Sequence, residues 1–172
     1  SLHTSHISGF TGRVSFKEAL FMGLAPDEGL FMPARIPKIT AHDIAAFKGM
    51  PYHAVACAIL SRYLDGTLSA ARLKAMCKDA YDFPVPLEQI DPATWLVRLD
   101  RGPTASFKDF AARMMARLMH SLKPPRSRIT VLVATSGDTG SAVGEAFRGL
   151  EGIAVRILYP RTEVSPVQKR QL

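Results

Sequence analysis

The segment 102–110, which reads GPTASFKDF, holds a lysine whose amine could act as a nucleophile. Ser106 can cap a helix, and Asp109 stands three residues later as the reciprocal partner of a capping box, so Lys108 falls in the first helical turn. The positive end of the helix dipole disfavours the ammonium form there. Schiff-base chemistry needs the neutral amine, so this placement favours Lys108 as a covalent catalyst. The alternative is a solvated surface lysine, which the flanking phenylalanines disfavour.

A second candidate is the segment 135–140, TSGDTG, which follows an apolar run and precedes a predicted helix. Ligands of open parallel sheets bind beyond the carboxyl ends of the strands, and N–H groups at the start of a helix attract anions. Gly137 and Gly140 would allow a ligand to approach the backbone closely. The Asp138 carboxylate would repel such an anion, so it is better suited to contact a cofactor hydroxyl or a substrate amine. The alternative is an ordinary capped turn; no nucleotide-binding motif matches.

These two segments need a framework of strands and helices to hold them. Residues 94–99 predict a strand and residues 107–122 a helix. Residues 129–134 form an apolar, β-branched run that predicts a strand buried on both faces. A helix over 141–148 and a strand over 153–159 then complete a parallel β-α-β unit.

The first half of the chain predicts short helices after an extended opening. Ser15 with Glu18 indicates a helix start, residues 25–29 a turn, and residues 30–33 an extended piece. Over 40–82, Thr40, Pro51 and Ser69 each begin a predicted helix. Because Phe-Pro-Val-Pro at 83–86 breaks the pattern, we expect domains of 1–86 and 87–172.

Composition excludes several classes of function. The 172 residues are 47% hydrophobic and 22% charged, which is typical of a globular protein with its own core. The net charge of +7 is scattered and has no interleaved aromatic residues, so we expect no nucleic-acid partner. Cys57 and Cys77 lack metal-ligand spacing, so we expect no metal and a reduced, cytoplasmic setting. The longest apolar run is too short to span a membrane, and no secretory signal is visible.

Taken together, the segments resemble the threonine synthase family over nearly the whole chain. GPTASFKD at 102–109, followed by a helix, a strand and TSGDTG, carries the resemblance in the second half. The opening is more family-specific, because related dehydratases and cysteine synthases lack it. The further matching segments are VSFKEAL at 14–20, GLAPD at 23–27, GLFMP at 29–33, LYP at 158–160 and VSPVQ at 164–168.

The resemblance implies an α/β fold in which a helical N-terminal cap is followed by a parallel β-α-β unit of a fold type II, pyridoxal-phosphate (PLP) enzyme. It implies conversion of O-phospho-L-homoserine and water to L-threonine and phosphate. Lys108 would form the Schiff base and then act as acid and base at Cα and Cβ. The implied cofactor contacts are Lys108, Phe107 and Asp138. The implied substrate contacts are Thr104, Ser106, Thr135, Ser136, Gly137 and Thr139.

Three departures qualify this resemblance. Glu28 stands where the family usually has glycine, and it is strained if that position needs a positive φ. Arg101 stands where histidine is common. Nothing after Gly140 supplies the family's glycine-rich phosphate loop, so we expect this chain to be an N-terminal portion that binds PLP weakly or not at all and is inactive alone. The alternatives are another fold type II lyase, such as a threonine or serine dehydratase, and a non-catalytic relative that binds a phosphorylated metabolite or a partner protein; the oligomeric state is left open.

Overall fold

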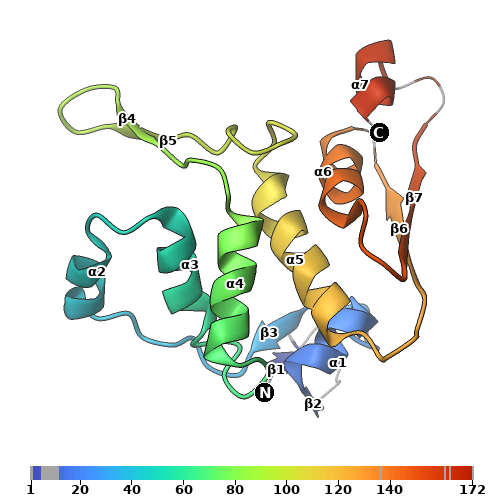
Figure 1. Cartoon of the computed structure of the whole chain (residues 1–172), viewed down its shortest axis with the longest axis horizontal. Coiled ribbons are helices and arrows are strands. Elements are labelled where there is room, and N and C mark those ends of the chain that lie inside the picture. Colours follow the sequence, from blue (N-terminus) through green and yellow to red (C-terminus); the bar gives the residue numbers. More distant parts are fainter. Residues whose placement is uncertain (1, 5–11, 136, 161, 163, 172) are drawn as a thin grey trace. The chain divides into compact units, whose positions relative to one another are not determined.

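The computed structural model describes residues 2–4, 12–135, 137–160, 162 and 164–171 (Figure 1). The chain forms two compact units, residues 1–75 and 76–172. The domain division expected at 86/87 stays a prediction.

The first unit begins with a small antiparallel sheet in the order β2-β1-β3. Short helices follow it. The elements are β1 (Leu2–Thr4), β2 (Arg13–Val14), α1 (Phe16–Met22), β3 (Phe31–Pro33), α2 (Ala41–Phe47), α3 (Tyr52–Leu60) and α4 (Ala70–Ala80), whose last turns belong to the second unit.

The helix starts predicted in the first unit are confirmed. Ser15 Oγ accepts from the Glu18 N–H at 3.2 Å, and the Glu18 carboxylate accepts from the Ser15 N–H at 2.7 Å. Thr40 and Asp43 form the same reciprocal pair at the start of α2, and Pro51 directly precedes α3. Hydrogen bonds from Thr40 and Arg62 hold the pKa of Asp43 well below its ordinary value. These local patterns fix where the helices begin.

Glu28 has a φ of 65°, in the left-handed region that favours glycine. It lies in a turn closed by its N–H, which donates to the Ala25 carbonyl at 2.8 Å. The backbone strain expected from the missing glycine is therefore present.

The second unit contains the predicted β-α-β arrangement. Its elements are β4 (Leu87–Gln89), β5 (Trp95–Val97), α5 (Lys108–Leu122), β6 (Ile129–Ala134), α6 (Asp138–Phe147), β7 (Ile153–Leu158) and α7 (Pro166–Gln171). Strands β6 and β7 pair in parallel, from Ile129 opposite Ile153 to Ala134 opposite Leu158. Figure 1 shows α6 between α5 and this pair of strands.

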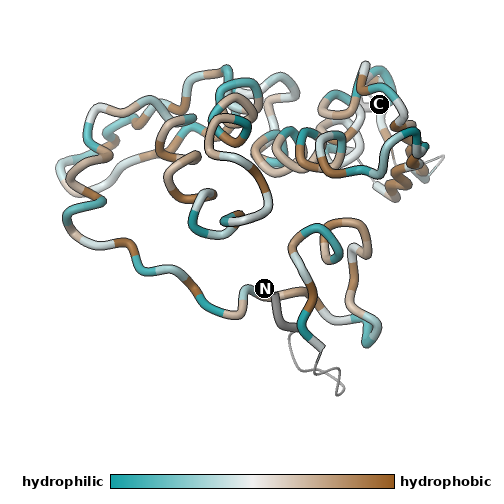
Figure 2. Tube along the Cα trace, turned by 60° about the horizontal axis from the view of Figure 1, so that its bottom comes forward, coloured by the Kyte–Doolittle hydropathy of each residue, from teal (hydrophilic) through white to brown (hydrophobic). Residues whose placement is uncertain are grey.

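The prediction that residues 129–134 are buried on both faces is wrong for the described structure. Positions along β6 and β7 alternate between half-buried and exposed, and Leu132 is 66% exposed. Both strands remain strongly hydrophobic in sequence (Figure 2). The physical reason is that β6 and β7 form a two-stranded sheet within the described residues, with α6 packed against it.

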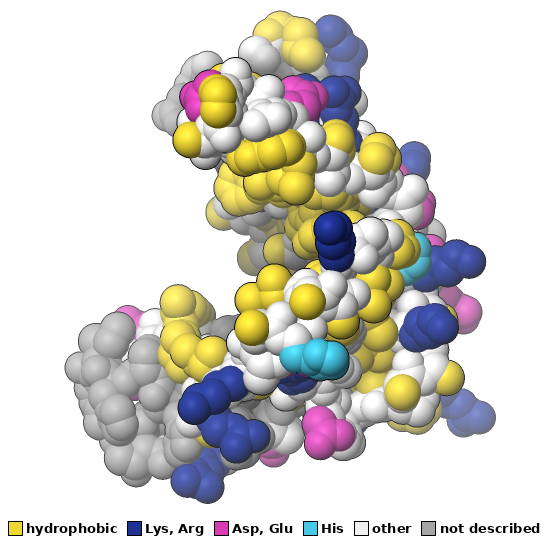
Figure 3. Space-filling view, turned by 90° about the vertical axis from the view of Figure 1, so that its left-hand side faces the viewer, with side chains coloured by type: hydrophobic (Ala, Val, Ile, Leu, Met, Phe, Trp, Pro, Cys, Tyr) yellow, Lys and Arg dark blue, Asp and Glu magenta, His cyan; other side chains and the backbone are white. Residues whose placement is uncertain are grey.

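The predicted strand at 94–99 is shorter than expected and has a partner that the sequence did not indicate. β5 pairs antiparallel with β4, with Leu87 opposite Val97. Hydrophobic side chains reach the surface around this hairpin (Figure 3); the exposed ones are Leu87, Ile90, Trp95, Leu96 and Val97.

Candidate active site

Lys108 lies in the first turn of α5, as predicted, and is its first residue, one position after the predicted start at Phe107, but the capping box predicted around it is wrong. The residue before the helix is Phe107, which makes no side-chain cap. Ser106 therefore lies one residue before the N-cap, and the carboxylate of Asp109, the second helical residue, binds Thr104 rather than the Ser106 backbone. Ser106 Oγ instead accepts from the Lys108 N–H at 3.3 Å, and Ser106 is buried.

The Asp109 carboxylate binds Thr104. Its two oxygens accept from the Thr104 N–H at 2.9 Å and from the Thr104 hydroxyl at 2.6 Å, and Asp109 is completely buried. A Cβ at Gly102 would clash with the carboxylate and lie 2.9 Å from the Asp109 Cβ. We call this arrangement the Thr104–Asp109 clasp; it ties the loop before α5 to the first helical turn.

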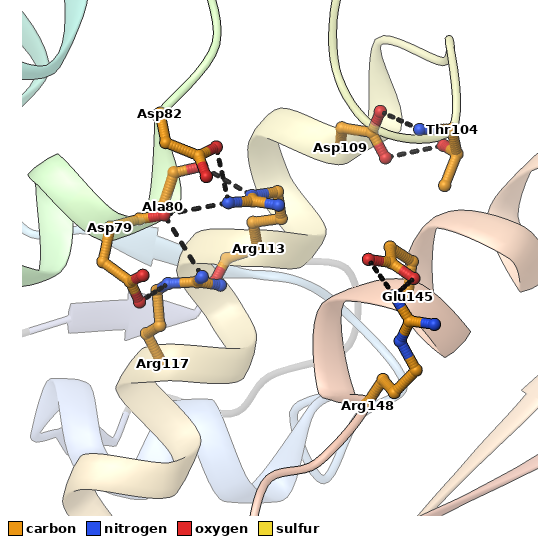
Figure 4. Close-up of polar contacts among 9 residues, drawn as sticks. All are labelled: Asp79, Ala80, Asp82, Thr104, Asp109, Arg113, Arg117, Glu145 and Arg148. Carbon is orange, nitrogen blue, oxygen red and sulfur yellow. Dashed lines mark hydrogen bonds and ion pairs between the residues drawn. The ribbon is translucent and has the colours of Figure 1, made fainter.

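Two arginines of α5 hold the helix against the end of α4 (Figure 4). Arg113 donates to the Ala80 carbonyl at 2.7 Å, to the Asp79 carbonyl at 2.9 Å and to the Asp82 carboxylate at 2.7 Å. Arg117 pairs with the Asp79 carboxylate at 2.5 Å. The last carbonyls of a helix lack partners within it, and Arg113 supplies donors to two of them.

The Lys108 amine lies beside Asp138 and Phe107. Nζ is 3.9 Å from Asp138 Oδ2 and 4.4 Å from the centre of the Phe107 ring. The side chains of Lys108 and Asp138 are 32% and 69% exposed, so this ion pair orients the groups more than it stabilises the fold. The predicted cofactor contacts are thus brought together.

A hollow of about 350 Å³ borders this group of side chains. Its wall is formed by residues 96–100 together with Ala105, Ser106, Phe107 and Asp138. Within that wall, hydrogen bonds from Arg98 lower the pKa of Asp100 to about 2. Arg101, which departs from the family pattern, lies 3.9 Å from the Glu88 carboxylate.

The segment 135–140 differs from its prediction as a loop. Helix α6 begins at Asp138, three residues before the predicted start at Ser141. Thr135 Oγ1 accepts from the N–H groups of Gly137 at 3.0 Å and Gly140 at 3.3 Å. These two N–H groups therefore bind the chain's own hydroxyl, and Thr135 takes the part of a helix cap.

The predicted substrate contacts have different surroundings. Thr139 is exposed, Gly137 is buried, and Ser136 lies outside the described residues. The hydroxyls of Thr104 and Ser106 bind the first two residues of α5, Asp109 and Lys108 respectively. Their role toward a substrate stays a prediction.

Sequence reasoning missed the residues that act over long separations. Arg113 reaches partners more than 30 residues earlier, and no local pattern signals such a contact. Gly102 could have been found, because a glycine beside proline before a helix often marks close packing.

Neither a metal centre nor a membrane span is found in the described part of the chain. No three His, Cys, Asp or Glu side chains gather there as ligands. No helix there is long and apolar enough to cross a bilayer.

Comparison with known proteins finds similarity to threonine synthases. Residues 7–81 match the family described as Threonine synthase N terminus. Threonine synthase from Haemophilus influenzae is 42% identical over 158 residues, covering 92% of this chain and 36% of that protein. A PLP-bound threonine synthase structure from Brucella melitensis aligns with a TM-score of 0.90 at 40% identity, covering 99% of this chain and 38% of the other.

A second solved structure agrees. Threonine synthase from Escherichia coli aligns with a TM-score of 0.84 at 35% identity, covering 92% of this chain and 37% of the other. The chain thus spans between 36% and 38% of the length of these relatives. Over nearly its whole length, the chain is a homologue of the N-terminal part of threonine synthases.

Proposed function

We propose that this chain is the N-terminal part of a PLP-dependent threonine synthase, which converts O-phospho-L-homoserine and water to L-threonine and phosphate. The observation that carries the proposal is Lys108 on the first turn of α5, with its amine beside Asp138 and Phe107. The sequence and structural similarity to threonine synthases around this lysine supports it.

The residues present fit one side of a PLP site. A primary amine that is about one-third exposed can form an imine with an aldehyde, and the hollow beside it has an aromatic and aliphatic wall. Lys108, Phe107 and Asp138 would hold the cofactor from this side. When bound, PLP supplies an electron sink for carbanion chemistry next to the substrate nitrogen.

The chain's own groups would then have distinct tasks. The Lys108 amine would take and return protons at Cα and Cβ of the substrate. The Asp138 carboxylate, 3.9 Å from that amine, would orient it. Thr104, Ser106, Thr135, Ser136, Gly137 and Thr139 remain the proposed substrate contacts.

The proposed architecture is that of a fold type II enzyme, with a domain of residues 1–86 followed by the start of the PLP domain at 87–172. The supporting observation is the parallel β6-α6-β7 unit, in which Asp138 begins α6 shortly after the carboxyl end of β6, where ligands of such sheets commonly bind. On this proposal the 172-residue chain alone binds PLP weakly, because groups for the cofactor phosphate lie elsewhere in the enzyme.

The test compares Lys108→Ala, Asp138→Ala and wild type in a threonine synthase polypeptide that includes this chain. Lys108→Ala should lose threonine formation and the visible absorbance of bound cofactor, with an unchanged thermal melt. Asp138→Ala should lower kcat/KM by tenfold or more, roughly 1.4 kcal/mol, with Tm shifted by only a few degrees. Near-normal turnover in folded Lys108→Ala would remove this lysine from catalysis.

A further inference from the structure

Asp109 is a charged side chain that the proposed chemistry does not use, although it is completely buried next to Lys108. Both of its oxygens accept hydrogen bonds from one residue, Thr104. Burying a carboxylate is costly unless it is hydrogen-bonded, so this clasp needs its two donors. Because this carboxylate is held firmly beside the proposed catalytic lysine, it is a candidate for a role in the proposed reaction.

The clasp encloses the strained part of the loop. Ala105 has a φ of 55°, a conformation that is unfavourable for any residue with a Cβ. It is held between the Ala105 N–H bond to the Gly102 carbonyl at 3.0 Å and the Thr104–Asp109 bonds. Because strained backbone persists only where the surroundings fix it, the clasp determines this loop conformation.

The loop conformation in turn determines where Lys108 lies. The Lys108 N–H donates to Ser106 Oγ, and the Asp109 N–H donates to the Ser106 carbonyl at 3.0 Å. Asp109 follows Lys108 on the same helical turn, so its buried side chain fixes the rotation of that turn about the helix axis. This rotation directs the Lys108 amine toward Asp138 and Phe107.

We propose that Asp109 is a positioning residue that sets the direction and reactivity of the Lys108 amine through the Thr104–Asp109 clasp. The inference rests on the proposed function. It also removes Thr104 from the proposed substrate contacts, because the Thr104 hydroxyl donates its proton to Asp109.

The experiment uses the PLP-loaded enzyme and the variants Asp109→Asn, Thr104→Val, Thr104→Ser and the double variant Thr104→Val with Asp109→Asn. The matched control is Thr40→Val with Asp43→Asn, because Thr40 and Asp43 make the same N–H and hydroxyl bonds at 2.8 Å and 2.7 Å at the start of α2. The measurements are kcat, KM, the thermal melt, and the pH titration of the visible absorbance of bound PLP.

We expect Asp109→Asn and Thr104→Val each to lower kcat about tenfold, with KM within twofold and the absorbance titration moved by more than half a pH unit. Thr104→Ser should restore both values, because it keeps the hydroxyl. The double variant should be no worse than the poorer single variant, since both changes break the same contact. The control pair should lose stability only.

Two outcomes would overturn the inference. One is a set of clasp variants that melt at lower temperature but keep wild-type kcat and absorbance titration. The other is a Thr104→Val effect confined to KM, which would return Thr104 to substrate binding. A wild-type enzyme with no visible absorbance from PLP would instead refute the proposed function, and hydrogen exchange of residues 102–109 in Asp109→Asn would still report whether the clasp orders the loop.

Discussion

Arg113→Met should lower the free energy of unfolding of the second unit by about 2–3 kcal/mol. Arg113 is 9% exposed and serves three acceptors. The Ala80 carbonyl bond is buried, and losing it leaves an acceptor unsatisfied at a cost of about 1–3 kcal/mol. The Asp79 carbonyl still accepts from Arg117 at 3.2 Å, so losing the Arg113 bond to this carbonyl costs less. The Asp82 side chain is 61% exposed, and that ion pair contributes only about 0–1 kcal/mol.

Urea unfolding of the chain, followed by far-ultraviolet circular dichroism, measures this loss as a lower midpoint at unchanged slope. Methionine keeps much of the arginine's apolar bulk over Phe83, whose ring centre lies 5.7 Å from the guanidinium carbon. The matched control is Asp82→Asn, which removes only the exposed ion pair and should cost less than about 1 kcal/mol. Equal losses in the two variants would show that the ion pair, not the helix-end carbonyls, carries the stabilisation, and would refute the reasoning.

Three further predictions follow from single contacts. Glu28→Gly should raise the free energy of unfolding by about 0.5–1 kcal/mol, because the backbone strain that glycine relieves at φ 65° exceeds the extra chain entropy that glycine loses on folding. Glu28→Ala keeps the Cβ and should leave the urea midpoint at the wild-type value. Thr135→Val should lower the free energy of unfolding by about 1–2 kcal/mol and speed amide hydrogen exchange at the start of α6. Thr135→Ser should do neither, because the serine hydroxyl can still accept from the N–H groups of Gly137 and Gly140. NMR titration should give the Asp100 carboxyl a pKa of about 2, below its ordinary value of 3.8, because Arg98 binds the charged form. The stabilisation from this contact is complete above pH 3.8 and is lost as the pH falls through 2. A titration midpoint near 3.8 would contradict the Arg98 contact.

Local sequence patterns predicted the helix starts well. Ser15, Thr40 and Pro51 lie where their helices begin, because caps depend on residues within one turn of each other. The parallel pairing of β6 and β7 was also predictable, since a helix between two apolar runs leaves few other topologies.

The errors arose where more than one local solution was available. Asp109 had two possible partners, Ser106 and Thr104, and the helix start at Lys108 decided between them. In the same way, the Thr135 hydroxyl allowed α6 to begin at Asp138, although the glycines there suggested a loop. The contacts of Arg113 span more than 30 residues and could not be read from any window of sequence.

The proximity of the proposed site residues was predictable, but their arrangement was not. The family resemblance implied Lys108, Phe107 and Asp138 as cofactor contacts, and the structure brings these side chains together, while their role stays a prediction. Their separation depends on how α5 and α6 pack, which is a tertiary property. The position of residues 96–100, which line the hollow, likewise depends on the pairing of β4 with β5.

The close packing of Gly102 against Asp109 restricts which sequences this loop can accept over evolutionary time. Any side chain at Gly102 would collide with the Asp109 carboxylate, so that change alone is penalised. Shortening Asp109 would make room but would leave Thr104 without its acceptor. A side chain at position 102 therefore requires a second change at Asp109, and that change removes the acceptor of Thr104, whereas serine can replace threonine in a single step because it keeps the hydroxyl.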